Sequence, residues 1–216
     1  MAFVVFLDAN VIYDAMIRDI LLTLAEDGVF RVHWSTDVLE EFKRARIRHL
    51  QRKGRWDDHV EQKIERTIEL MNRTFPEALV KASQYQTLIP AMGNDPKDRH
   101  VLAAAIVAGA SVIVTYNVKH FPFEICDPLG IEVQNPDTFL LHQLQLVPQR
   151  VAPRIFSLLQ IRVKEPYSSW QSLNEALKDR VPNFQRALSK HPLARHLFAG
   201  NDILESQSEE DGLDCL

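Results

Sequence analysis

Residues 95–121 read DPKDRHVLAAAIVAGASVIVTYNVKHF. Pro96 suits the first position of a helix, because its missing N–H would have no intrahelical partner there. Gly109 fits the left-handed residue that ends a helix, and the β-branched run at 112–114 is typical of a strand covered on both faces. The stretch therefore predicts a helix from Pro96 to Gly109 and then a buried strand, with Asn117 just beyond its carboxyl end.

Strands and helices alternate along the rest of the chain up to about residue 145. Short apolar runs predict further strands at 3–7, 30–34, 78–80 and 131–133. Helical spacing predicts helices from Val11 to Gly28, from Asp37 onward with Ser35 or Thr36 as cap, from Asp57 to Phe75 and from Pro136 to Leu144, with a loop at 84–94. This alternation predicts an α/β fold, a mainly parallel sheet of about five strands with helices on both faces.

The character of the sequence changes near residue 150, beyond which no strand is evident. We expect three parts: a sheet domain at 1–147, a helical extension at 148–204 and a disordered acidic tail at 205–216. Within the extension, helices are expected at 151–159 and at 170–188, the second capped by Ser168 or Ser169.

Composition is ordinary for a soluble globular protein. The 216 residues are 46% hydrophobic and carry a net charge of −4, which argues against a protein that coats nucleic acid by bulk charge. Two cysteines do not make a disulfide framework, and no leader or membrane span is evident, so the cytoplasm is the expected location. The one basic concentration, at 43–55, is either a solvated helix face or a contact for phosphates or an acidic partner.

Three carboxylates that lie far apart in the sequence are expected to meet. Asp8 ends the first strand, while Glu41 and Asp98 stand in the first turns of their helices. Each could serve only as a cap or complement a helix dipole. Parallel strands and the helices that follow them meet along one sheet edge, however, and carboxylates gathered there repel one another unless a cation lies between them. All-oxygen ligands favour Mg²⁺ or Mn²⁺, and no cluster with zinc spacing competes.

Several short motifs together resemble a known family. They are LDANV at 7–11, the segment 35–42 that contains Glu41, DPKDRHVLAAA at 95–105 and VTYN at 114–117. In this order the chain resembles PIN-domain ribonucleases of the bacterial toxin–antitoxin type, the VapC-like toxins, from residue 3 to about 142. The resemblance implies a PIN-like parallel sheet, Mg²⁺- or Mn²⁺-dependent cleavage of single-stranded RNA, frequent homodimers and inhibition by a cognate antitoxin protein.

The resemblance also assigns individual residues. Asp8, Glu41 and Asp98 match the family's first three acidic positions, and Asp95 is a supporting acid at the rim. The fourth position is usually Asp in a Thr-x-Asp motif, or Asn followed three residues later by Asp before Phe. Here it is Asn117, two residues after the supporting Thr115, and the later position is His120. The predicted catalytic and metal-binding set is therefore Asp8, Glu41, Asp98 and Asn117. An amide oxygen ligates without adding charge, so we expect modest metal affinity.

Three functions are open at this point. The first is a metal-dependent endoribonuclease toxin that uses a metal-activated water and leaves a 3′-hydroxyl and a 5′-phosphate, with Lys43, Arg44 and Arg48 holding RNA. The second is a PIN-fold module that binds RNA or a protein without turnover. The third is a receiver-type phosphoacceptor with Asp8 modified and Thr115 and Lys119 assisting. Metal-dependent cleavage separates the first two, and labelling by a small phosphodonor tests the third.

Overall fold

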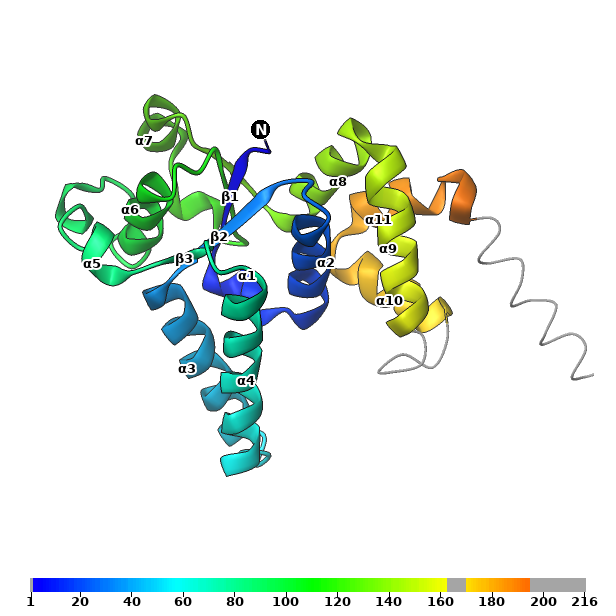
Figure 1. Ribbon diagram of the computed structural model, residues 1–216, viewed down its shortest axis with the longest axis horizontal. Coiled ribbons are helices and arrows are strands. Elements are labelled where there is room, and N and C mark those ends of the chain that lie inside the picture. The colour runs from blue at the N-terminus through cyan, green and yellow to red at the C-terminus, as the bar shows by residue number, and fades with distance from the viewer. Residues whose placement is uncertain (1, 163–169, 195–216) are drawn as a thin grey trace, which may run out of the picture. The chain divides into compact units, whose positions relative to one another are not determined.

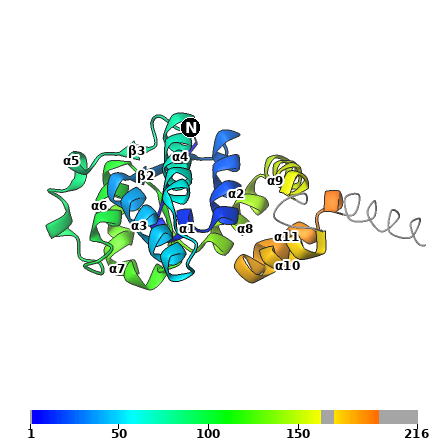
Figure 2. The same cartoon turned by 90° about the horizontal axis from the view of Figure 1, so that it is seen from below.

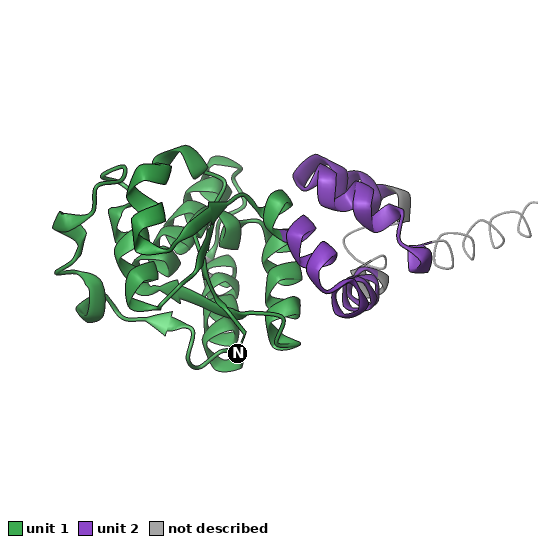
Figure 3. Cartoon of the chain, turned by 90° about the horizontal axis from the view of Figure 1, so that it is seen from above, with its two compact units in different colours: residues 1–139 green, residues 140–216 purple. Residues whose placement is uncertain are grey.

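The computed structural model describes residues 2–162 and 170–194. The chain forms two compact units, residues 1–139 and 140–216 (Figure 3). The predicted cap at Ser168 or Ser169 and the predicted tail at 205–216 lie outside the described residues.

The first unit contains a five-stranded, wholly parallel sheet (Figure 1). Its strands are β1 (Val4–Leu7), β2 (Arg31–Ser35), β3 (Leu79–Val80), β4 (Val112–Val114) and β5 (Glu132–Gln134). They lie in the order β3-β2-β1-β4-β5, with helices on both sides. The predicted α/β fold is confirmed. The central strands are apolar in sequence because they are covered on both faces: every residue of β4 and all but the first of β1 are buried.

Helices connect these strands. They are α1 (Ala9–Tyr13), α2 (Ala15–Glu26), α3 (Thr36–Arg52), α4 (Asp58–Thr74), α5 (Ala82–Tyr85), α6 (Arg99–Val107), α7 (Phe123–Cys126) and α8 (Pro136–Leu146), with 3₁₀ turns η1 (Ile89–Ala91), η2 (Val118–His120) and η3 (Asp127–Leu129). The long pair α3 and α4 lie side by side in both Figure 1 and Figure 2. The core is mainly aliphatic, and its largest fully buried side chains include Trp34, Tyr85, Phe6, Phe30 and Phe139.

The helix predicted to begin at Pro96 starts later, at Arg99. Residues 95–98 instead form a turn, in which the Asp98 N–H donates to the Asp95 carbonyl at 2.9 Å. Asp98 therefore precedes α6 and does not stand in its first turn. The predicted end of this helix is confirmed, since Gly109 has φ of +65° and its N–H donates to the carbonyl of Ile106.

Other predicted boundaries also need correction. The helix expected from Val11 to Gly28 is two helices, because Asp14 accepts from the N–H groups of Met16 and Ile17 and so starts α2. Glu41 lies in the second turn of α3, not the first, because that helix begins at Thr36. The loop expected at 84–94 contains the end of α5 and the turn η1.

The second unit is helical in its described residues, with α9 (Pro148–Arg162), α10 (Trp170–Arg180) and α11 (Pro182–Ser189). The helix expected at 170–188 is divided at Pro182, which cannot continue a helix that precedes it. Its buried side chains include Ile155, Phe156, Leu173, Leu177 and Phe184. Among the described residues of the whole chain, none of the helices is both long enough and apolar enough to cross a membrane.

Candidate active site

The pairing of β1 with β4 places the first predicted site residues together. Leu7 pairs with Val114, so Asp8 and Thr115 are the first residues beyond two adjacent strand ends. The Asp8 N–H continues the ladder by donating to the Val114 carbonyl at 3.1 Å. Asp8 is then the N-cap of α1, the role that the sequence left open beside metal binding. A strand end and a helix start thus both fix this residue.

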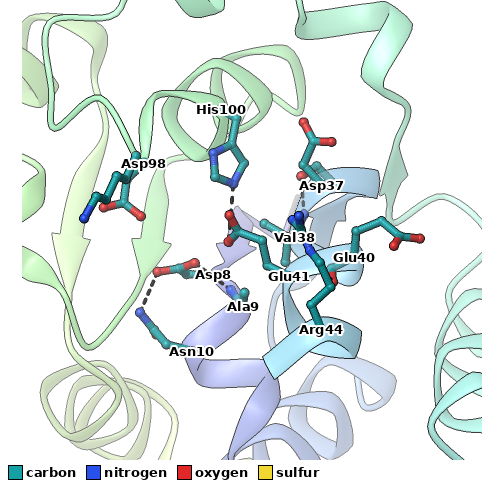
Figure 4. A network of polar contacts seen from close by, with 12 residues as sticks. Asp8, Ala9, Asn10, Asp37, Val38, Glu40, Glu41, Arg44, Asp98 and His100 are labelled. Carbon is teal, nitrogen blue, oxygen red and sulfur yellow. Dashed lines mark hydrogen bonds and ion pairs between the residues drawn. The ribbon is translucent and has the colours of Figure 1, made fainter. Parts of the chain in front are cut away.

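The Asp8 carboxylate is held by three donors. The Ala9 N–H donates to one oxygen at 2.6 Å and the Asn10 amide donates to the other at 2.7 Å (Figure 4). The Thr115 hydroxyl donates to the same oxygen as Asn10, at 2.6 Å. The residue is only 2% exposed. Burial raises the pKa of Asp8, and the charges of Asp98 and Glu41 raise it further, while its hydrogen bonds act in the opposite direction.

Asn10 links the two strand ends, a role that sequence reasoning missed. Its amide nitrogen also donates to the Thr115 hydroxyl oxygen at 3.0 Å, and its carbonyl oxygen accepts from the Tyr116 N–H at 3.1 Å. The Thr115 hydroxyl oxygen accepts in addition from the Asn117 N–H at 3.0 Å. The only signal in the sequence was a polar residue two places after Asp8. Its partners on the other strand end, Thr115 and Tyr116, lie more than a hundred residues away in the sequence.

One cleft of about 970 Å³ brings the four predicted catalytic and metal-binding residues together. It is lined by Asp8, Glu41, Asp98 and Asn117, among others. In Figure 4 the carboxylates of the three acids point into a common space from three different segments. Two neighbouring acids raise the pKa of Asp8, and such a cluster is what a positive ion would relieve. Three carboxylates and an amide oxygen are the hard donors that Mg²⁺ or Mn²⁺ prefers. Among the described residues, however, the group of acids and histidines whose ligand atoms lie within 4.8 Å of one another is Asp95, Asp98 and His120.

His100 contacts the cluster from α6, and sequence reasoning gave it no role. Its Nε2 lies 3.6 Å from a carboxylate oxygen of Glu41 (Figure 4). Burial lowers the pKa of His100, but the interactions with Glu41 and the charges of Asp37 and Asp8 together outweigh this effect, and the net result is a raised pKa. A protonated imidazole here would orient Glu41 toward the cleft. The position of His100, two residues after Asp98, was the available clue.

His120, in the turn η2 after β4, contacts the Asp98 carboxylate. Its Nδ1 is 2.5 Å from a carboxylate oxygen of Asp98. Asp95, the expected rim acid, does not line the cleft: its carboxylate accepts from the Lys97 N–H at 3.0 Å, and its own N–H donates to the His120 carbonyl at 3.1 Å. Ligand atoms of Asp95, Asp98 and His120 nevertheless lie within 4.8 Å of one another. The loop before α6 and the loop after β4 are thereby tied together.

The basic residues divide between two faces of α3. Arg44 and Arg48 line the cleft, as does Arg52, which sequence reasoning did not single out. Lys43 does not, because its amino group pairs with Glu65 at 2.7 Å and with Glu61 at 3.3 Å on α4. The expected set of RNA-binding bases therefore has two members at the cleft and one committed elsewhere.

Comparison with known proteins identifies the family. The sequence matches the PIN domain over residues 4–119, more than half of the chain. The chain belongs to the PIN-domain family. The match ends two residues after Asn117, so the PIN domain contains every residue of the acidic cluster. Membership of the PIN-domain family argues against the receiver-type alternative. Lys119, which that alternative needs near Asp8, lines a different cleft with Phe121 and Cys126.

A relative in Mycobacterium tuberculosis (strain ATCC 25618 / H37Rv) carries the name "Putative ribonuclease VapC50". It is 44% identical over 100 residues, which cover 46% of this chain and 59% of the relative. The chain thus spans somewhat more than half of the length of that protein. No solved structure matched the chain significantly.

Proposed function

We propose that this PIN-domain protein is a metal-dependent endoribonuclease that cleaves single-stranded RNA, and that it is the toxin of a toxin–antitoxin pair. The observation that carries the proposal is the convergence of Asp8, Glu41, Asp98 and Asn117 in one open cleft on a PIN fold. The name of the M. tuberculosis relative supports the same activity. A cognate antitoxin and a homodimer are further expectations of this proposal.

Asp8, Glu41, Asp98 and Asn117 would hold Mg²⁺ or Mn²⁺ in this scheme. A divalent ion at such a site lowers the pKa of a water molecule and neutralises charge on phosphate oxygens. The chain's own residues prepare for that task. Ala9, Asn10 and Thr115 fix both oxygens of Asp8, so little reorganisation is needed when substrate arrives.

The other residues of the cleft orient the acids and the substrate. His100 faces Glu41, and His120 holds Asp98 from outside the cleft lining. Arg44 and Arg48 offer guanidinium groups to the phosphates that flank the scissile bond. The cleavage leaves a 3′-hydroxyl and a 5′-phosphate, the outcome expected for attack by water on phosphorus with the 3′-oxygen as leaving group.

One departure favours a second candidate function. Asn117 brings no charge where the family usually has Asp, so the cleft has three carboxylates and not four. A chain that binds metal too weakly would recognise RNA or a protein partner without turnover. The two functions differ in one measurable property, which is metal-dependent cutting.

The test is a cleavage assay on end-labelled single-stranded RNA with Mg²⁺ or Mn²⁺ added. The controls are a chelator and the Asp98→Asn variant, which removes one negative charge and preserves side-chain shape. We expect cutting by the parent protein and none in either control. Cutting by Asp98→Asn at the parental rate would show that the proposed site is wrong. A protein that binds RNA and metal without cutting it would favour the binding module.

A further inference from the structure

One face of α3 lines the cleft along most of the length of the helix. The residues on this face recur at intervals of three or four, as neighbours on one side of a helix do. They are Glu41, Arg44, Ala45, Arg48, Gln51 and Arg52. The face therefore begins at the acidic cluster with Glu41 and continues away from it as a row of three arginines, Arg44, Arg48 and Arg52, here called the arginine row.

Within the part of the chain that the structure describes, no carboxylate forms an ion pair with the arginine row. All three side chains are exposed. Their recorded hydrogen bonds go to backbone carbonyls one turn earlier, from Arg44 to Glu40 at 3.3 Å and from Arg52 to Arg48 at 3.4 Å. Like charges four residues apart on a helix destabilise it. An anionic ligand would relieve that repulsion.

Lys43 is on the same helix but differs from the arginine row because it has acidic partners. Lys43 is on the face of α3 that meets α4, and two glutamates neutralise it there. Lys43 thus has acidic partners within the protein, and the three arginines that line the cleft have none among the described residues. This distribution indicates that the negative charge for the arginine row comes from outside the chain.

The spacing of the row suits a nucleic-acid strand. Residues four apart on a helix rise by about 6 Å, so Arg44 and Arg52 are separated by about 12 Å along the axis. The rise of about 6 Å between neighbouring arginines is comparable to the distance between successive phosphates in an extended single strand. Guanidinium groups bind phosphate oxygens in a fixed, two-pronged geometry, and they stay charged at any physiological pH.

We propose that the arginine row binds consecutive phosphates of one RNA strand on one side of the scissile bond. Arg44 contacts the phosphate nearest to the acidic cluster, and Arg52 contacts the farthest. This inference rests on the proposed function, because it takes the scissile phosphate to lie at the cluster. We take RNA and not an acidic protein segment as the occupant because the row begins at the acidic cluster, where the proposed function places the scissile phosphate.

The test is a binding measurement that does not depend on cleavage. Full-length protein is titrated against a labelled single-stranded RNA of about 12 nucleotides, with a chelator present, and fluorescence anisotropy is followed at several salt concentrations. We expect Arg52→Gln to weaken binding about threefold or more. The slope of log K against log salt should become shallower by about 0.7 for each phosphate that the protein no longer neutralises, so Arg48→Gln with Arg52→Gln together should change it by about 1.4.

The matched control is Arg66→Gln, which removes an exposed arginine of α4 that does not line the cleft. It should leave both the affinity and the salt slope unchanged. Arg52→Gln with parental affinity and slope would overturn the proposal. So would a poly-glutamate peptide that binds more tightly than the RNA and loses its affinity in Arg52→Gln, since the row would then serve a protein partner. Cleavage by the parent protein is scored separately, so that RNA binding without cutting refutes the nuclease and leaves the arginine row intact.

Discussion

Asn117 occupies the position at which the resemblance to PIN-domain ribonucleases leads us to expect either Asp or an Asn with a later Asp. It lies at the end of β4, its N–H donates to Thr115, and it lines the same cleft as the three acids. Its amide oxygen can ligate a hard ion but adds no charge to the site. Asn and Asp differ in one heavy atom, so the replacement of this one side chain would add a charge to the acidic cluster.

Replacement of Asn117 by Asp should tighten the binding of Mn²⁺, because a fourth carboxylate joins the cluster without a change in side-chain size. Isothermal titration calorimetry on the parent and on Asn117→Asp would measure this. The control is Asn183→Asp, which adds the same charge on α11, in the other unit, and should leave the affinity unchanged. Equal affinities for parent and Asn117→Asp would place Asn117 outside the ligand set.

At the scale of elements, α3 carries both an acid of the cluster and the arginine row. Glu41 and Arg44 are only three positions apart on this helix. Its second turn presents Glu41 to the acidic cluster, and its later turns present the arginine row. The orientation of both depends on how firmly the helix begins. Ser35, the last residue of β2, is fully buried, and its hydroxyl oxygen accepts from the Val38 N–H at 3.2 Å as the N-cap of α3.

Replacement of Ser35 by Ala should lower the free energy of unfolding by about 1 kcal/mol, since one N–H of the first turn loses its partner. Urea denaturation would measure the change. Thr67→Ala is a suitable comparison, because the Thr67 hydroxyl only bonds back to the Lys63 carbonyl within α4. That variant should stay within about 0.5 kcal/mol of the parent. A Ser35→Ala protein as stable as the parent would mean that the cap contributes nothing.

At the scale of the whole molecule, one buried imidazole should contribute a loss of stability in mild acid. His33 on β2 is 7% exposed, and its Nδ1 has no hydrogen-bond partner among the described residues. Burial lowers the pKa of His33 below its ordinary value of 6.5, and nearby Arg31 lowers it further. The unfolded chain then takes up the proton first. Stability is therefore full above the ordinary pKa and is lost as pH falls through 6.5 toward the folded-state value.

Urea unfolding at two pH values, one on each side of that window, would measure the effect. In His33→Phe the difference in unfolding free energy between the two values should shrink, because no proton can be taken up at this position. His59→Phe, a change at an exposed position on α4, should keep the parental difference. If His33→Phe kept the parental difference as well, another group would be responsible for the acid sensitivity.

The sheet was predictable because burial leaves a direct trace in the sequence. Central parallel strands are covered on both faces, and a short β-branched run such as Val112–Val114 is typical of that position. Boundaries set by single side chains were less accessible. Nothing local distinguished Asp14, which starts a new helix, from Asp95, which forms a turn before one. A short polar side chain serves either purpose.

The site was predicted to the extent that it follows from strand ends and family motifs. The acids and Asn117 were in reach for that reason, and the structure places them in one cleft. Asn10 and His100 were not, because their partners Thr115 and Glu41 are distant in sequence and only the folded chain brings them near. Their contribution is orientation, which leaves no compositional signature.

The spatial order of the strands has a consequence for how the protein is made. β1 lies between β2, which follows it closely, and β4, which is synthesised some hundred residues later. A nascent chain that has emerged only through α4 has Asp8 and Glu41 but neither Asp98 nor the neighbouring strand end that holds Asp8 in place. Under the proposed function, the growing polypeptide is therefore harmless to RNA until β4 has left the ribosome, and a chain interrupted before that point is innocuous to the cell that translates it.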